Sequence, residues 1–207
     1  MPLPLAKNTP QIDPGKLRFL VYGPPKIGKS TFATRNPKAI VLDCDNNGTE
    51  FLDCWRVPIN DWNALKSTLG ELAKDETGRF DTVVIDTIER AHQLCREHVC
   101  KTNGVSHESE DKSFGRIWDL VKTEFVKMIS FIGQMNKGLW MICHSVQKEV
   151  KIDGIKRAVT TTSMTDKAGK LVAATADVII YMDFDEGGKR KLFLKAQDSI
   201  ECGDRTK

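Results

Sequence analysis

The sequence of 207 residues has little net charge, no long hydrophobic run and no Cys-x-x-Cys pair. A helix needs about twenty consecutive apolar residues to cross a bilayer, so no membrane-spanning helix is expected. The N-terminus also lacks a charged segment followed by an apolar stretch, and these features predict a cytoplasmic protein. The formal charge of +3 is too small to indicate a nucleic-acid partner unless the basic residues cluster.

The six cysteines show no spacing typical of a metal site. Several of them fall within apolar patterns of strands or helices, so we expect buried, reduced thiols. The composition, with 40% hydrophobic and 29% charged residues, is typical of a globular chain with one sizeable core. We find no internal repeat.

The most informative motif is the segment 23–30, GPPKIGKS, which fits the pattern G-x-x-x-x-G-K-[ST] of a phosphate-binding P-loop. It follows the apolar run 17–22, which predicts the buried strand that such a loop requires. Pro24 and Pro25 have no N–H group, so the amides of residues 27–31 must form the phosphate cradle. The predicted nucleotide-binding residues are Gly23, Pro24, Pro25, Lys26, Ile27, Gly28, Lys29, Ser30 and Thr31.

Three side chains are expected to act on the phosphates and on a magnesium ion. Lys29 should reach the β- and γ-phosphates as a point charge, and the Ser30 hydroxyl should coordinate Mg²⁺. The run 80–86 predicts a strand ending on Asp86, a Walker B pattern whose carboxylate would lie beside the P-loop and hold the magnesium water shell. The structural alternative for Asp86 is a helix N-cap. The sequence therefore predicts ATP and Mg²⁺ as ligands.

Strands and helices alternate along the chain. Residues 1–15 predict an irregular N-terminal arm, and residues 16–207 predict one core. Strands are predicted at 17–22, 39–42, 80–86, 139–143, 177–182 and 191–194, and helices at 29–35, 62–72, 87–101, 114–135 and 171–176. This order predicts an α/β fold with a mainly parallel central sheet between helical layers and a C-terminal antiparallel hairpin.

An ATPase needs a group that orients a water molecule in line with the γ-phosphate. Many motor ATPases have a glutamate directly after the Walker B aspartate, but Thr87 occupies that position here. The other arrangement places the carboxylate after the strand 39–42, where Asp43, Asp45 and, farther on, Glu50 follow. Asp45 is our first choice.

The order of the motifs GPPKIGKST, VLDCD, VVIDT and MICHS, followed by a basic hairpin and a closing DRTK, resembles the RecA-type ATPase core. It is most similar to the small phage-encoded RecA-core proteins of the Sak-four type, which are single-strand annealing or recombination proteins. The resemblance covers roughly residues 16–207. It implies a RecA-like P-loop NTPase that hydrolyses ATP and acts on single-stranded DNA in phage DNA metabolism, in the host cytoplasm.

The resemblance also implies partners. The chain would assemble as a homo-oligomer, a ring or a filament, with ATP at the subunit interfaces. A single-strand-binding protein is a further implied partner.

Carried over to this sequence, the family pattern assigns further catalytic residues. Asp45 stands where the family has a glutamate, and its shorter side chain predicts slow turnover. His144, expected at the end of the strand 139–143, matches the γ-phosphate sensor; a hydrogen-bonded histidine at a strand end is the alternative. Arg205 and Lys207 fall where related proteins place cations that reach a neighbouring subunit's nucleotide, and a frayed basic terminus is the alternative.

The segment after His144 takes the place of the family's second DNA-binding loop. Charged and apolar residues alternate around Asp153-Gly154, which predicts a β-hairpin. The residues expected to follow a DNA backbone are Lys148, Lys151, Lys156 and Arg157, although such a charge run is also typical of a solvated face. Residues 102–113 match the first loop but are acidic on balance, which argues against DNA contact there.

Two other functions remain open. A nucleotide or small-molecule kinase would close an arginine-rich lid over its acceptor, whereas the segment 145–160 is rich in lysine with one arginine. An interaction module gated by ATP, with little hydrolysis, is consistent with an aspartate at position 45.

Overall fold

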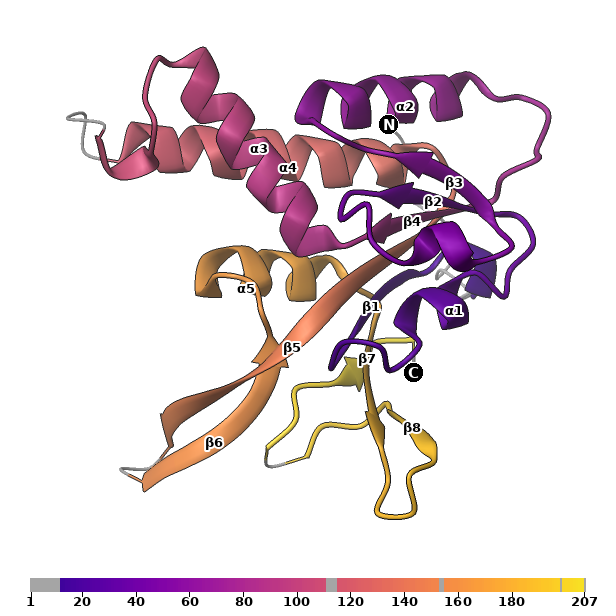
Figure 1. Cartoon of the computed structure of the whole chain (residues 1–207), viewed down its shortest axis with the longest axis vertical. Coiled ribbons are helices and arrows are strands. Elements are labelled where there is room, and N and C mark those ends of the chain that lie inside the picture. The colour runs from indigo at the N-terminus through magenta and orange to yellow at the C-terminus, as the bar shows by residue number, and fades with distance from the viewer. Residues whose placement is uncertain (1–11, 111–114, 153–154, 198, 207) are drawn as a thin grey trace, which may run out of the picture.

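The computed structural model describes residues 12–110, 115–152, 155–197 and 199–206, except the side chains of residues 151, 152, 155 and 166 (Figure 1). The strands are β1 (Arg18–Gly23), β2 (Ala39–Asp43), β3 (Trp55–Pro58), β4 (Thr82–Asp86), β5 (Gly138–Ile152), β6 (Ile155–Thr162), β7 (Val178–Phe184), β8 (Arg190–Phe193) and β9 (Gly203–Asp204). The helices are α1 (Lys29–Ala33), α2 (Trp62–Lys74), α3 (Ile88–Thr102), α4 (Arg116–Gln134) and α5 (Asp166–Thr175), with 3₁₀ turns η1 (Pro14–Lys16), η2 (Thr49–Phe51) and η3 (Glu108–Glu110).

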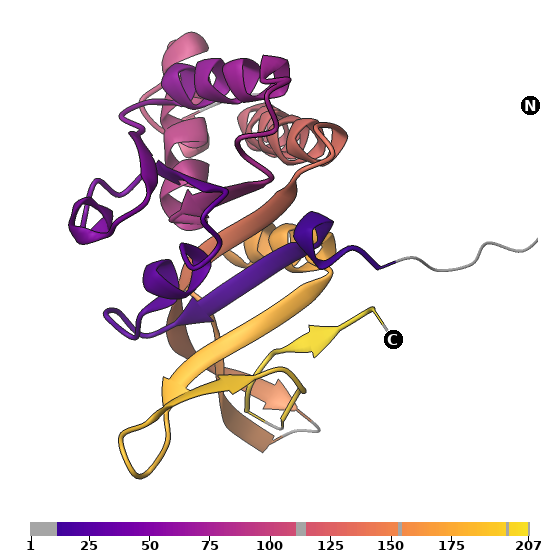
Figure 2. The ribbon, with the colours of Figure 1, turned by 90° about the vertical axis from the view of Figure 1, so that its right-hand side faces the viewer.

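The strands form one sheet in the order β3-β2-β4-β5-β1-β7-β8. All neighbours from β3 to β7 pair in parallel, whereas β8 and β9 pair antiparallel to β7. Figure 2 shows β1 and β7 side by side, with the C-terminal strands beyond them. The predicted α/β fold, with its mainly parallel sheet and its C-terminal antiparallel pair, is confirmed.

Four helices cover one face of the sheet, and α1 with the P-loop covers the other. On one face Leu20 and Tyr22 of β1 share a core with the buried residues of α2, α3, α4 and α5. On the other face Val21 of β1 joins a smaller core with Ile27 of the P-loop and Ala33 of α1. Because β2 and β4 are buried on both faces, all five residues of each are buried, which is why they read as continuous apolar runs.

Apart from shifts of one to three residues at the ends of several elements, β5, α5 and β3 differ from the sequence-based expectation, and the short strand β9 was not predicted. β5 does not end at His144 but continues to Ile152, because β6 pairs with its second half. α5 begins at Asp166 rather than at residue 171, since polar residues interrupt the apolar pattern of its first turns. β3 was not predicted, because its alternating segment has only four residues, ends in a proline and lies exposed or half-buried at the edge of the sheet.

Some predictions fall outside the described residues. These are most of the N-terminal arm, residues 1–11, and the turn at Asp153 and Gly154. Within the ranges that the structure covers, no helix is long and apolar enough to cross a bilayer.

The cysteines are mostly buried, as predicted. Five are buried and Cys54 is partly exposed. Burial raises the pKa of the Cys95 thiol to about 12, which keeps it protonated and unreactive at neutral pH.

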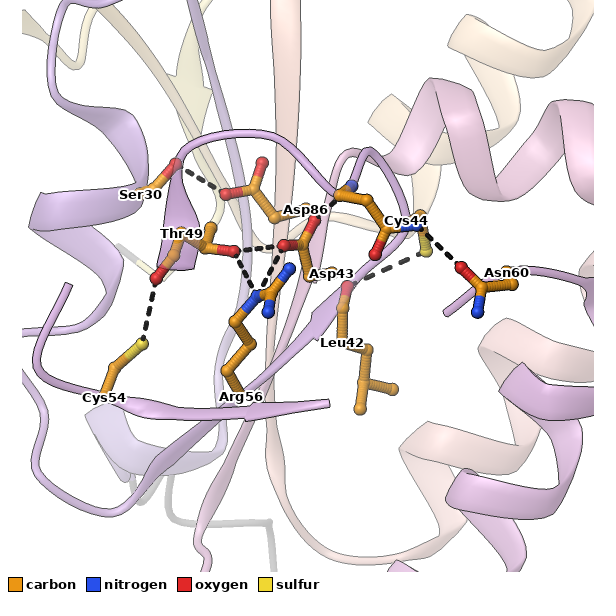
Figure 3. Close-up of polar contacts among 10 residues, drawn as sticks. Ser30, Leu42, Asp43, Cys44, Thr49, Cys54, Arg56, Asn60 and Asp86 are labelled. Atoms are coloured by element: carbon orange, nitrogen blue, oxygen red, sulfur yellow. Dashed lines mark hydrogen bonds and ion pairs between the residues drawn. The ribbon is translucent and has the colours of Figure 1, made fainter. Parts of the chain in front are cut away.

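β2 ends on a buried carboxylate that ties it to the edge strand β3 (Figure 3). Asp43 accepts hydrogen bonds from Arg56 Nε at 2.8 Å, from the backbone N–H of Asn46 at 2.8 Å and from the Thr49 hydroxyl. The Asp43 side chain is only 1% exposed, so Arg56 supplies its neutralising charge almost without water. This ion pair fixes the end of β2, from which the loop to Asp45 continues.

Arg56→Ala should lower the free energy of unfolding by about 3 kcal/mol, because it leaves the Asp43 carboxylate buried without its cation. Urea denaturation measures this loss. Lys74→Ala is the control. Lys74 forms an exposed ion pair with Glu71, so its removal should lower the free energy of unfolding by less than about 0.5 kcal/mol. Equal losses in the two variants would contradict the role given to Arg56.

Candidate nucleotide and hydrolysis site

The P-loop follows β1 directly, and two of its residues have backbone dihedral angles that most residues avoid. Lys26 and Gly28 have φ angles of 64° and 97°, the left-handed region that favours glycine. A Cβ atom on Gly23 would lie 2.3 Å from the backbone oxygen of Met182 in β7. Only glycine therefore fits at position 23, and the loop is pressed against the neighbouring strand.

Lys29 is buried at the start of α1, and its side chain turns back over the loop. Its Nζ donates to the backbone oxygens of Gly23 and Pro24, both at 2.9 Å. Because an ammonium group has three N–H donors, one remains for a phosphate oxygen. Burial lowers the pKa of Lys29, while the nearby carboxylates of Asp86 and Glu89 act in the opposite direction.

Ser30 and Asp86 meet at the edge of the sheet (Figure 3). The Ser30 hydroxyl donates to Asp86 Oδ2 at 2.5 Å. Burial raises the pKa of Asp86 to about 6, against the opposing effect of the Ser30 hydrogen bond. Hydroxyl and carboxylate oxygens are ligands that Mg²⁺ prefers, so these two groups fit the magnesium role predicted for them.

The alternative interpretation of Asp86 as a helix N-cap is wrong. α3 is capped by Thr87, whose hydroxyl accepts from the backbone N–H of Arg90 at 3.4 Å. The backbone oxygen of Asp86 instead accepts from the N–H groups of Cys44, at 2.6 Å, and Asp45, at 3.3 Å. The loop after β2 is thus attached to the end of β4.

The three candidate carboxylates for hydrolysis have different environments. Asp43 is engaged with Arg56, as described above. Asp45 and Glu50 are both exposed, but Glu50, in η2, does not line the cavity beside His144. Asp45 lines a cavity of about 260 Å³ together with Glu89 and His144. Desolvation, and next the charge of Glu89, raise the pKa of Asp45. The geometry therefore supports Asp45 over its two neighbours.

Glu89 is a site residue that the sequence reasoning missed. Its Oε1 accepts from the backbone N–H of His144 at 3.0 Å, lies 2.6 Å from His144 Nδ1 and accepts from the Ser163 hydroxyl at 3.3 Å. The motifs predict a carboxylate directly after Asp86 or after the strand 39–42, whereas Glu89 lies in the first turn of α3. Asp86 ends β4, so no helical spacing relates it to Glu89 and no local pattern marks this glutamate.

His144 lies next to the P-loop. In the register of β5 against β1 it is the partner of Gly23. The hydrogen bond with Glu89 raises its pKa, although burial opposes this effect. His144 therefore lies beside the P-loop, within the strand rather than at its end, and is hydrogen-bonded as the alternative interpretation expects. Its role as a phosphate sensor stays a prediction.

The hairpin of β5 and β6 extends away from the sheet (Figure 1), and its basic residues divide between its two faces. Lys148 is opposite Val159, and Val150 is opposite Arg157. Side chains alternate along a strand and cross-strand partners share a face, so Lys148 and Arg157 lie on the same face.

The other two basic residues of the hairpin are opposite each other in the register, Lys151 and Lys156. Lys156 forms an exposed ion pair with Glu149, with 3.2 Å between Nζ and Oε2. The side chain of Lys151 lies outside the described residues.

The acidic segment 102–113 contains a structural carboxylate. Glu108 is buried and paired with Arg96, whose Nη2 donates to Oε2 at 2.8 Å. At least one carboxylate of this segment therefore has a structural role. Residues 111–113 lie outside the description.

Arg205 lies at the edge of the sheet opposite the P-loop. Its guanidinium donates to the backbone oxygen of Ala174 at 2.8 Å, and its backbone N–H donates to that of Asp177 at 3.0 Å. Asp177 precedes β7, at the amino ends of the parallel strands, whereas the P-loop follows their carboxyl ends. Arg205 therefore lies at the other end of β7 from the P-loop of its own subunit, and its role at a neighbouring subunit's nucleotide stays a prediction. Lys207 lies outside the described residues.

Asp86→Asn should stabilise the protein without ligands at pH 7.5 by about 1–3 kcal/mol. A carboxyl group whose folded pKa is raised, here to about 6, contributes stability below its ordinary pKa and loses it as the pH rises through 6. The stability that Asp86→Asn gains over the wild type should therefore vanish near pH 4. Urea denaturation in EDTA at both pH values measures it, and an Asn variant less stable than the wild type at pH 7.5 would contradict it.

Residues 15–206 match the model of a family described as AAA domain. No curated protein matches the chain. Similar solved structures include a RadB recombinase (16% identity, TM-score 0.48, covering 91% of this chain and 90% of that chain) and the KaiC-like protein PH0186 from Pyrococcus horikoshii OT3 (12%, 0.49, 86% and 77%). The flagellar accessory protein FlaH from Methanocaldococcus jannaschii is also similar (11%, 0.43, 85% and 75%). Because the family model spans nearly the whole chain, the protein belongs to the AAA domain family of P-loop ATPases.

Proposed function

We propose that this protein is a magnesium-dependent ATPase of the RecA type that binds single-stranded DNA through the β5–β6 hairpin and promotes annealing or recombination. The resemblance to phage-encoded proteins of the Sak-four type supports the DNA role. ATP would lie between subunits of a homo-oligomer, where Arg205 and Lys207 of one subunit face the nucleotide of the next. A single-strand-binding protein is the further partner that this role implies.

The continuity of β5 is the observation that carries this proposal. β5 pairs with the P-loop strand from residue 139 to residue 144 and then, without a break, with β6 from residue 145 to residue 152. The backbone N–H of Ser163, just after β6, donates to the backbone oxygen of His144 at 2.9 Å. Both ends of the hairpin are therefore attached at the position next to the nucleotide site, so a movement there reaches the hairpin directly.

The residues of the site have separable roles in hydrolysis. Lys29 and the amides of the loop would hold the phosphates, and Ser30 and Asp86 would hold the magnesium ion. When bound, that ion neutralises charge developing on the β- and γ-phosphates. Asp45 orients the attacking water molecule, and Glu89 positions the His144 ring at the γ-phosphate.

DNA binding would rest on the basic hairpin, with Lys148 and Arg157 as its principal contacts because they share one face. Lys156 lies on the other face, in an exposed ion pair with Glu149, and Lys151 is opposite Lys156 in the register. Contacts of this kind follow the phosphate backbone without reading sequence, and they weaken steeply with salt.

Single-stranded DNA should stimulate ATP hydrolysis several-fold at low salt, and the double variant Lys148→Ala/Arg157→Ala should lose this stimulation while its DNA-independent rate persists. The loss follows from removing two phosphate contacts. A coupled ATPase assay with and without a labelled oligonucleotide, together with a gel-shift titration, measures both quantities.

Two variants control this experiment. Lys29→Ala should abolish hydrolysis in every condition, and Lys156→Ala should reduce the stimulation less than the double variant does. Hydrolysis indifferent to DNA, with no shift of the oligonucleotide at low salt, would refute the DNA role and leave the nucleotide site intact. Transfer of phosphate to a nucleoside monophosphate would favour a kinase.

Asp45→Asn should slow single-turnover hydrolysis by at least about tenfold while ATP affinity changes little, because a neutral amide orients the water less well than a carboxylate does. Rapid-quench measurements at saturating ATP give the rate, and equilibrium titration gives the affinity. Glu50→Gln is the matched control, since Glu50 is exposed away from the cavity. An unchanged rate in Asp45→Asn would exclude Asp45 from this role.

A further inference from the structure

The hairpin between β7 and β8 lies against the P-loop and presents an arginine to it. Its turn is fixed by Asp185, whose side chain accepts from the backbone N–H groups of Gly187, at 3.0 Å, and Lys189, at 2.8 Å. The backbone N–H of Asp185 donates to the Lys189 oxygen at 2.8 Å, and Gly188 takes a φ of 74°. Arg190, the first residue of β8, therefore leaves a well-defined turn.

Packing fixes the position of this hairpin relative to the loop. Met182 of β7 shares the smaller core with Ile27 of the P-loop, and the backbone oxygen of Met182 lies where a Cβ of Gly23 would be. β7 also pairs with β1 along residues 178–181, so the turn that follows β7 is held beside the P-loop by strand pairing and by packing.

Arg190 lies on the face of the sheet that carries the P-loop. Met182 is opposite Leu192 in the register, and Arg190 is two residues from Leu192, so these three residues share a face. Lys191 lies on the other face, with its Nζ 5.0 Å from the centre of the Phe193 ring. The two adjacent cations of β8 therefore point in opposite directions.

The guanidinium of Arg190 covers Gly28. A Cβ atom built on Gly28 would lie 3.2 Å from Arg190 Cζ and 3.4 Å from its Nε and Nη1. The Lys29 ammonium lies at the start of the same loop, on the Gly23 and Pro24 oxygens, so the two cations contact different parts of the P-loop. The absence of a side chain at position 28 is what lets the guanidinium approach the backbone this closely.

Within the described residues, no hydrogen bond or ion pair engages the Arg190 guanidinium. Four arginines are paired with a carboxylate, namely Arg18, Arg56, Arg90 and Arg96. A guanidinium presents five N–H donors in a planar fork that matches phosphate oxygens. An unpaired fork over a phosphate-binding loop points to an anionic ligand at that place.

We propose that Arg190 binds the phosphate chain of the nucleotide in its own subunit, on the side of the loop at Gly28. This inference rests on the nucleotide site of the proposed function and adds a ligand contact to it. The ligand class is a nucleoside di- or triphosphate, and inorganic pyrophosphate shares the recognised chemistry. Arg190 would thus supply from within the subunit a second cation beside Lys29.

Binding of MgADP and of magnesium pyrophosphate to the full chain tests this proposal. Arg190→Ala should weaken both ligands by about tenfold or more, the value of a charge-assisted hydrogen bond, as measured by calorimetry for MgADP and by competition for pyrophosphate. Arg190→Lys should fall between the wild type and Arg190→Ala, because it keeps the charge without the fork. Lys191→Ala, the matched neighbour on the other face, should stay within about twofold of the wild type, since surface charges away from a ligand contribute little.

Several outcomes would overturn the proposal. If the wild type binds MgADP and Arg190→Ala binds it equally well, the inference fails while the nucleotide site stands. A loss of affinity for MgADP with no loss for pyrophosphate would show that Arg190 contacts the base or the ribose instead. If the wild type binds neither ligand, the nucleotide site and this inference fail together, whereas a lack of DNA stimulation affects only the DNA role. Thermal unfolding of Arg190→Ala, expected to match the wild type, excludes misfolding as the cause of a loss.

Discussion

The parallel register of β2, β4, β5 and β1 is the constraint on which the site depends. Parallel pairing brings the carboxyl ends of all four strands to one edge, where Asp43 lies beside Asp86 and Gly23 beside His144. The Ser30 hydroxyl therefore reaches Asp86 although the two residues are 56 positions apart in the chain. A slip of one residue in either pairing would turn these side chains to the other face of the sheet and separate them.

Close packing of backbone against backbone holds the P-loop at this edge. The contact between Gly23 and the Met182 oxygen leaves no room for a side chain, so the glycine of the motif serves the sheet as well as the phosphates. The same contact fixes β7 and the hairpin that follows it, which brings Arg190 to Gly28. The need for a glycine at position 23 thus links the P-loop to β7, which lies about 160 residues later in the sequence.

The site and the hairpin share one strand, and this arrangement explains the role of Glu89. Its carboxylate joins the start of α3 to His144 in β5 and to Ser163 after β6. Sequence reasoning missed Glu89 because a lone glutamate in a helical turn carries no pattern. It also ended β5 too early, because a charged, alternating segment indicates a hairpin but does not show that the hairpin continues an inner strand.

The sequence by itself determined the features that arise locally. The P-loop, the apolar strands that lead to Asp43 and Asp86, and the existence of the basic hairpin follow from motif spacing and periodicity, which depend on neighbouring residues. Only the tertiary structure decided which carboxylate is structural, which face of the hairpin each cation occupies, and that Glu89 and Arg190 approach the site. Those placements depend on strand register and on packing between segments distant in sequence, for which a single sequence holds no local signal.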